Sequence, residues 1–191
     1  MNTGIQHIRM EKLITFGILS LPIVIVSWHS LFRIKTHGFY RFFSWECILW
    51  LLLSNFKFWF IDPVSFHQII SWMFLFYASY LVIAGAIKLS KAKKSGQARK
   101  EEKLYQFEKT SELIDTGIFK FIRHPLYSSL LFLTWGICLK NVSGFLIIIS
   151  LLSSTALLMT ALRDEKECIA YFGDVYRNYM KQTKRFVPFI F

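Results

Sequence analysis

Residues 113–127, LIDTGIFKFIRHPLY, and residues 163–179, RDEKECIAYFGDVYRNY, decide how this chain is organised. An apolar stretch of about 35 residues separates these two polar runs, which is long enough to cross a membrane and return. Such a hairpin delivers both runs to the same face of the membrane. We therefore expect one site to be built from two distant pieces of the sequence.

The composition is that of a membrane protein. Of the 191 residues, 54% are hydrophobic and 18% are aromatic, and the mean hydropathy is +0.40. These values are too apolar for an ordinary soluble domain of this length. The sequence therefore predicts an all-α, polytopic membrane protein embedded in a lipid bilayer.

Apolar runs predict about five transmembrane helices and a C-terminal interfacial helix. The fourth run falls short of the roughly 20 residues that a span needs, so we expect Arg123 and His124 at or just below the membrane surface. Pro125 suits the first position of that helix. An amphipathic pattern interrupted at Gly173 predicts the interfacial helix. The predicted spans are residues 13–32, 42–60, 66–89, 125–139 and 145–162.

The net charge of +11 arises mainly from the segments between and after the spans. Residues 33–41, 88–123 and 163–185 hold 19 of the 23 Lys and Arg residues. Because cytoplasmic loops are rich in these residues, we expect the N-terminus outside, the C-terminus in the cytoplasm and the site at the cytoplasmic leaflet. The lysines are not interleaved with aromatic residues, which argues against a nucleic-acid partner.

The chain divides into three parts by composition. Residues 1–89 contain three predicted transmembrane helices, and residues 90–112 form a basic cytoplasmic linker. Residues 113–191 form the third part, with a loop, a helical hairpin over 125–162 and C-terminal helices. The hairpin is the element that joins the two polar runs.

The cysteines and histidines show no metal-binding pattern. Cys47, Cys138 and Cys168 lie far apart, and no two histidines are three or four residues apart. Zinc sites and disulfide frameworks usually show closer, regular spacings. The sequence therefore predicts neither a metal nor a disulfide framework.

Side chains of opposite charge gather at the predicted mouth of the hairpin. Arg123, His124 and Tyr127 lie at the start of the fourth span, and Asp164 and Glu165 follow the fifth. Each residue alone is more often structural, as a snorkelling arginine, a helix cap or an interfacial aromatic. Together, a cation, an imidazole and a phenol opposite an acidic pair indicate a ligand that carries both charges.

The same residues carry a resemblance to a known superfamily. The series G-I-F-x-x-I-R-H-P-L-Y, then D-E-K-x-C-x-x-x-F-G-D-x-Y-x-x-Y and R-F-V-P, resembles isoprenylcysteine carboxyl methyltransferases and phospholipid methyltransferases. The resemblance covers residues 113–188, whereas the first three spans match in kind only. It implies a membrane-embedded methyltransferase that uses S-adenosylmethionine without a Rossmann domain, and the chain indeed lacks G-x-G-x-x-G.

The resemblance also implies roles for individual residues. A carboxylate can hold the cofactor's ammonium or ribose, an imidazole and backbone N–H groups its carboxylate, and aromatic faces its sulfonium. Arg123 is the implied substrate-contacting or catalytic residue. The implied cofactor-binding residues are Ser111, Glu112, Leu113, Ile114, Phe119, His124, Pro125, Leu126, Tyr127, Asp164 and Glu165.

Four positions depart from the prenylcysteine enzymes of this superfamily. Ser111 stands in place of a histidine, Phe119 of a tyrosine and Asp164 of a glutamate. Thr160 stands where those enzymes have an arginine that meets the substrate carboxylate. We therefore expect a lipophilic acceptor, which is a phospholipid amine, a prenyl-type carboxylate or a small apolar compound.

Two other functions fit the same residues. Membrane sterol reductases, which use NADPH, share a similar R-H-x-x-Y motif and acidic tail, although Ser128 and Ser129 replace the Gly-Asp that follows their tyrosine. A membrane scaffold that kept the fold without the chemistry fits the substitutions at Ser111, Phe119 and Thr160. A comparison of binding to S-adenosylmethionine and to NADPH separates the enzyme alternatives.

Overall fold

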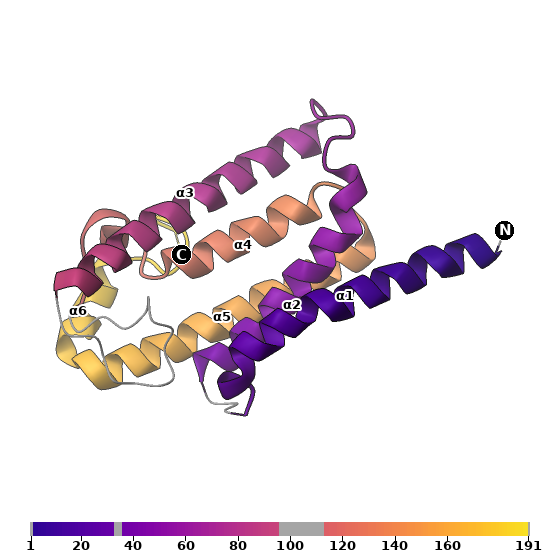
Figure 1. Cartoon of the computed structure of the whole chain (residues 1–191). Helices are drawn as coiled ribbons and strands as arrows, with labels where there is room; N and C mark the ends of the chain where they lie inside the picture. The colour runs from indigo at the N-terminus through magenta and orange to yellow at the C-terminus, as the bar shows by residue number, and fades with distance from the viewer. Residues whose placement is uncertain (1, 33–35, 96–112, 191) are drawn as a thin grey trace.

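The computed structural model describes residues 2–32, 36–95 and 113–190 (Figure 1). Within these ranges the chain forms helices and no strand, which confirms the all-α expectation for this part of the chain. Most of the predicted basic linker lies outside the described residues. The helices are α1 (Asn2–Leu31), α2 (His37–Asn55), η1 (Phe56–Phe58), α3 (Phe66–Ser95), η2 (Gly117–Lys120), α4 (Pro125–Cys138), α5 (Gly144–Phe172) and α6 (Asp174–Gln182).

Three of the described helices are long and apolar enough to cross a membrane. These candidate spans are Met10–Leu31, Phe66–Lys91 and Gly144–Phe172. The helices α2 and α4, with 19 and 14 residues, are not among them. At 1.5 Å per residue α4 is only about 21 Å long, less than the roughly 30 Å of hydrocarbon in a bilayer. A total of five spans therefore stays a prediction.

The helices α1, α2, α3 and α5 extend beyond the apolar runs that predicted them. The helix α5 continues past residue 162 and ends at Gly173, whose φ of 61° favours glycine. The helix α2 begins at His37 instead of residue 42, and Glu167 of α5 accepts from the backbone N–H of His37 and contacts its Nδ1 at 2.8 Å. His37 and Glu167, which lie in these two extensions, are thus paired across the interface between α2 and α5.

The short helix α4 lies between α3 on one side and α2 and α5 on the other (Figure 1). Glycines allow α3 and α4 to approach closely at both ends of their contact. A Cβ at Gly136 would lie 2.9 Å from Leu75 Cδ2, and one at Gly85 would lie 3.2 Å from Leu126 Cδ2. Such close approach is how helices associate in a bilayer, where apolar burial gives no advantage over lipid.

The far end of α4, where the chain turns into α5, is fastened by neutral side chains of α2 and α3. Asn55 Nδ2 donates to the carbonyl of Ile137 at 2.6 Å, and Ser71 Oγ donates to that of Gly136 at 2.6 Å. These bonds satisfy carbonyls that the end of a helix leaves without an intrahelical partner. The far end is thus held rigidly by long-range contacts.

Lys140, in the same turn, is a buried cation. Its side chain is enclosed, with 1% of the residue exposed, and its Nζ donates to Gln68 Oε1 at 3.0 Å. The Nζ also lies 3.6 Å from the ring centroid of Trp72 and 5.4 Å from that of Trp59. The amide oxygen and the two aromatic faces replace water around the ammonium.

The helices that flank α4 extend further than α4 does at its near end. The helices α3 and α5 contain 30 and 29 residues, about twice the 14 of α4. Their last turns extend beyond the start of α4, and α6 lies at this end (Figure 1). The residues in front of Pro125 are therefore flanked by helices of three different parts of the chain.

Candidate functional site

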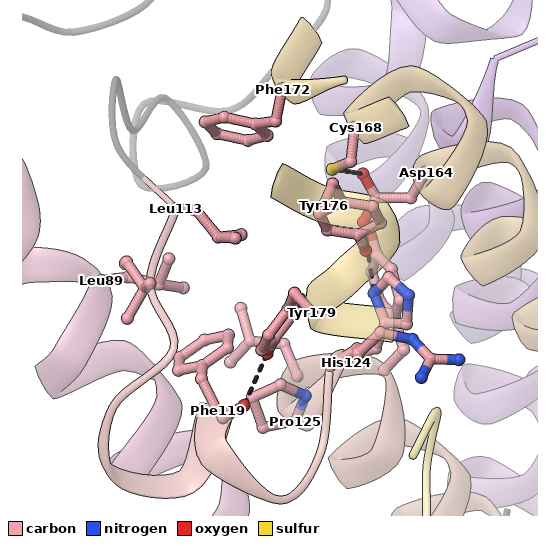
Figure 2. A pocket seen from close by; sticks show the side chains of 14 residues that line it. Leu89, Leu113, Phe119, His124, Pro125, Asp164, Cys168, Phe172, Tyr176 and Tyr179 are labelled. Atoms are coloured by element: carbon pink, nitrogen blue, oxygen red, sulfur yellow. Dashed lines mark hydrogen bonds and ion pairs between the residues drawn. The ribbon is translucent and has the colours of Figure 1, made fainter. Parts of the chain in front are cut away.

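A cavity lies in front of the N-terminus of α4, between the last turns of α3 and α5 (Figure 2). It holds about 760 Å³ of space between the atoms, which includes a part that is open to solvent. Leu89, Leu113 and Phe119 lie on one side of it, opposite Asp164 and Tyr176 (Figure 2). The lining residues are Leu89, Leu113, Ile114, Phe119, Arg123, His124, Pro125, Leu126, Tyr127, Asp164, Cys168, Phe172, Tyr176 and Tyr179.

Most of the predicted site residues line this cavity. Among the predicted positions, Ser111 and Glu112 lie outside the described residues, and Glu165 lies behind His124 and is not a lining residue. The structure thus brings the two polar runs together at one cavity. The roles of the individual residues stay predictions. The predicted residues that line the cavity are Leu113, Ile114, Phe119, Arg123, His124, Pro125, Leu126, Tyr127 and Asp164.

The loop before α4 is shaped by Gly117. This residue has a φ of 64°, and a Cβ added there would lie 2.5 Å from Lys88 Cε, so a side chain would be both strained and crowded. The following 3₁₀ helix buries Phe119, whose backbone carbonyl accepts from the Tyr179 hydroxyl at 2.6 Å (Figure 2). This bond fastens α6 to the loop across the cavity.

His124 lies between two carboxylates. Its Nδ1 is 3.4 Å from Asp164 Oδ2 and its Nε2 is 3.4 Å from Glu165 Oε1. The buried Nε2 has no hydrogen-bond partner among the residues that the structure describes. Burial alone lowers the pKa of His124, but the interactions with Asp164 and Glu165 outweigh it and raise the pKa above its ordinary value. The site therefore favours an imidazolium.

Two arginines hold Glu165. Arg185 Nε and Nη2 donate to Glu165 Oε1 and Oε2 at 3.0 and 2.9 Å, and Arg123 Nε donates to Oε1 at 3.1 Å. The Nη1 of Arg123 also donates to the backbone carbonyls of Met180 and Thr183. Arg123 thus fastens the C-terminal segment as well as lining the cavity, and its predicted role toward a substrate stays a prediction.

Two tyrosines of α6 also line the cavity. The amphipathic pattern of this segment allows the two tyrosines to cover the cofactor, but it favours packing on the membrane surface. In the structure Tyr176 and Tyr179 are 3% and 7% exposed and line the cavity. Phe172 stacks on Tyr176 with ring centroids 6.4 Å apart. Burial raises the pKa of both phenols, so both stay neutral. The difference arises because Gly173 turns α6 back across the end of the bundle.

A family model described as phospholipid methyltransferase matches residues 69–179, which is more than half of the chain. The chain belongs to the phospholipid methyltransferase family. The match runs from α3 into α6 and includes the helices that wall the cavity. It confirms the superfamily that the sequence motifs indicated.

Curated relatives of this phospholipid methyltransferase family member match over a short segment. A methanethiol S-methyltransferase from Pseudomonas deceptionensis is 30% identical over 71 residues, 37% of this chain and 26% of that protein. The enzyme of that name from Crocosphaera subtropica (strain ATCC 51142 / BH68) is 26% identical over 74 residues, 39% of this chain and 28% of that protein. The chain therefore matches about a quarter of the length of these relatives. No solved structure matches the chain.

Several lining residues of this phospholipid methyltransferase family member were not predicted. Cys168 and Phe172 follow Asp164 at intervals of four residues, so they share its face of α5, and this spacing would have identified them. Leu89 is one apolar residue in a long apolar helix and gives no sequence signal. Arg185, the first residue of the R-F-V-P segment, donates to Glu165, and no role at the site was predicted for it.

Proposed function

We propose that this protein is an integral membrane methyltransferase that transfers a methyl group from S-adenosylmethionine to a lipophilic acceptor. The observation that carries the proposal is the pairing of His124 with Asp164, 3.4 Å apart at a cavity of the phospholipid methyltransferase domain. The family and the relatives named as S-methyltransferases support methyl transfer over the reductase and scaffold alternatives. The distribution of basic residues supports a site at the cytoplasmic leaflet with the N-terminus outside.

The residues around the cavity fit S-adenosylmethionine. The molecule carries an ammonium, a carboxylate and a sulfonium, and the cavity offers charges of both signs. Asp164, whose side chain is 21% exposed, suits the ammonium or the ribose hydroxyls. His124 and the first N–H groups of α4 suit the carboxylate. The two nitrogens of the His124 ring each lie 3.4 Å from a carboxylate, of Asp164 and of Glu165, so the imidazole is placed among groups that favour its charged form.

The protein's part in catalysis is orientation and exclusion of water. When bound, the cofactor supplies a methyl group on a positively charged sulfur. The aromatic walls formed by Phe119, Tyr176 and Tyr179 place electron-rich faces around such a charge and keep the site dry. Methyl transfer depends on in-line placement of donor and acceptor, and fixed walls around the cavity would favour that placement.

Of the three acceptor classes, a carboxylate has the least support. Thr160 is buried and its hydroxyl donates to the carbonyl of Ala156 at 2.8 Å. Arg123, the lining cation on which a carboxylate would depend, is already bound by Glu165 and by two backbone carbonyls. We therefore propose a phospholipid amine or a small apolar thiol as the acceptor. The amine would react through the lone pair of its neutral form and the thiol as its thiolate, so the acceptor gives up a proton and the cofactor leaves as S-adenosylhomocysteine.

Binding of S-adenosylmethionine to the purified protein, measured by titration calorimetry in detergent or nanodiscs, tests the proposal. We expect saturable binding to the wild type that His124→Ala and Asp164→Ala each weaken at least about tenfold. Asp174→Asn is the matched control, because that carboxylate is 86% exposed on α6 and is paired with Arg177. A wild type that binds NADPH and ignores S-adenosylmethionine would overturn the proposal.

A further inference from the structure

Residues 183–186, which we call the C-terminal strap, lie against the loop that precedes α4. The backbone N–H of Arg123 donates to the carbonyl of Lys184 at 2.8 Å, and that of Lys184 donates to Phe121 at 3.1 Å. The backbone N–H of His124 donates to the carbonyl of Arg185 at 3.3 Å. Because these bonds join backbone atoms, they place Arg185 beside the site independently of its side chain.

The side chain of Arg185 then makes two parallel bonds to one carboxylate. Its Nε and Nη2 lie 3.0 and 2.9 Å from the two oxygens of Glu165. A bidentate arginine fixes both the position and the plane of a carboxylate, which a lysine cannot do. The pair is largely shielded, with side-chain exposures of 19% and 5%, so solvent screens it only partly.

The fixed carboxylate is the one that faces the inner edge of His124. Glu165 Oε1 lies 3.4 Å from His124 Nε2, on the opposite side of the ring from Asp164. With both oxygens of Glu165 engaged by arginines, Asp164 is the carboxylate that lines the described part of the cavity. Without Arg185, Arg123 is the one cation among the described residues that still holds Glu165, and the His124 ring loses a fixed partner on one edge.

We propose that Arg185 is a positioning residue, which holds Glu165 against His124 and so orients the imidazole that faces the cavity. Arg185 is not a lining residue, so its effect on a ligand is indirect. The inference rests on the proposed function, because it is expressed as affinity for S-adenosylmethionine.

A double-mutant cycle between Arg185 and Glu165, read out as affinity for S-adenosylmethionine in nanodiscs, tests this role. Arg185→Ala is expected to weaken binding about tenfold or more, and Arg185→Lys by less, because lysine restores the charge without the second bond. In a Glu165→Gln background, Arg185→Ala is expected to add less than about twofold, since the two residues act through one contact. Lys184→Ala is the matched control. Lys184 precedes Arg185 in the strap, its own side chain is exposed, and the substitution leaves the backbone hydrogen bonds of the strap in place.

The possible outcomes are distinct. Equal losses on Arg185→Ala in both backgrounds, or wild-type affinity in Arg185→Ala, overturn the inference while leaving the proposed function intact. A wild type that does not bind S-adenosylmethionine overturns the proposed function itself. If Arg185→Ala does not fold, as judged by size-exclusion chromatography, Arg185→Lys is used in the same cycle, and wild-type affinity in that variant overturns the inference.

Discussion

The two ends of α4 are built on opposite principles. At the far end, neutral donors from Asn55 and Ser71 satisfy the last carbonyls, and Lys140 is enclosed by Trp72. At the near end, side chains of both charges line a cavity, and His124 lies between Asp164 and Glu165. Neutral contacts therefore hold the far end, whereas the near end presents charged groups to a cavity.

Glu165→Ala provides the strongest test of this comparison. The change leaves Arg123 and Arg185 facing each other without their shared carboxylate. Removing one partner of a buried ion pair costs about 3–5 kcal/mol of unfolding free energy. We expect a large fall in the thermal unfolding midpoint in detergent. A midpoint within error of the wild type would show that the charges of the near end do not hold the fold.

Asn55→Ala tests the far end. The side chain donates to the carbonyl of Ile137 at 2.6 Å. This carbonyl also accepts from the backbone N–H of Lys140 at 3.1 Å, so the variant loses one buried hydrogen bond, which costs about 0.5–1.5 kcal/mol. The variant should unfold at a lower temperature and still bind S-adenosylmethionine with wild-type affinity. A loss of affinity in the folded variant would show that the two ends are coupled.

The charge of His124 makes the near end sensitive to pH. Because the pKa of this buried imidazole is raised from its ordinary 6.5, its protonation contributes stability that is complete below about pH 6.5 and is lost as the pH rises through the raised value. The unfolding midpoint should therefore fall as the pH is raised from about 6 to 9. His124→Gln should flatten this slope, and an equal slope in both proteins would assign the effect to other groups.

Lys140→Met should have the smallest effect. The substitution removes the cost of keeping a charge out of water, and this gain offsets the loss of the hydrogen bond to Gln68 Oε1. We expect a change in unfolding free energy within about 1 kcal/mol, as for other volume-conserving replacements. A larger loss, measured by the thermal midpoint, would show that the contact with Trp72 contributes more than it costs.

The meeting of the two polar runs was predictable because it depends on the length of the hairpin between them. The extension of α5 past residue 162 was not, since a hydropathy pattern ends where Asp164 and Glu165 begin, although these residues continue the helix. The burial of Lys140 was also not predictable, because Gln68 and Trp72 lie about 70 residues earlier in the chain. Long-range partners decide such positions, and local patterns do not contain them.

The N-terminus of α4 forms the floor of the cavity, so the length of α4 sets the depth to which a ligand can enter. Adding one helical turn before Pro125 would extend α4 by about 5.4 Å into the cavity, whereas removing one turn would make the cavity deeper by the same amount. Neighbouring walls would stay in place, because α3 and α5 already reach past that point. Insertions and deletions of about four residues at this boundary would therefore change the size of the cavity in large steps, and substitutions of the lining side chains would change it in small ones.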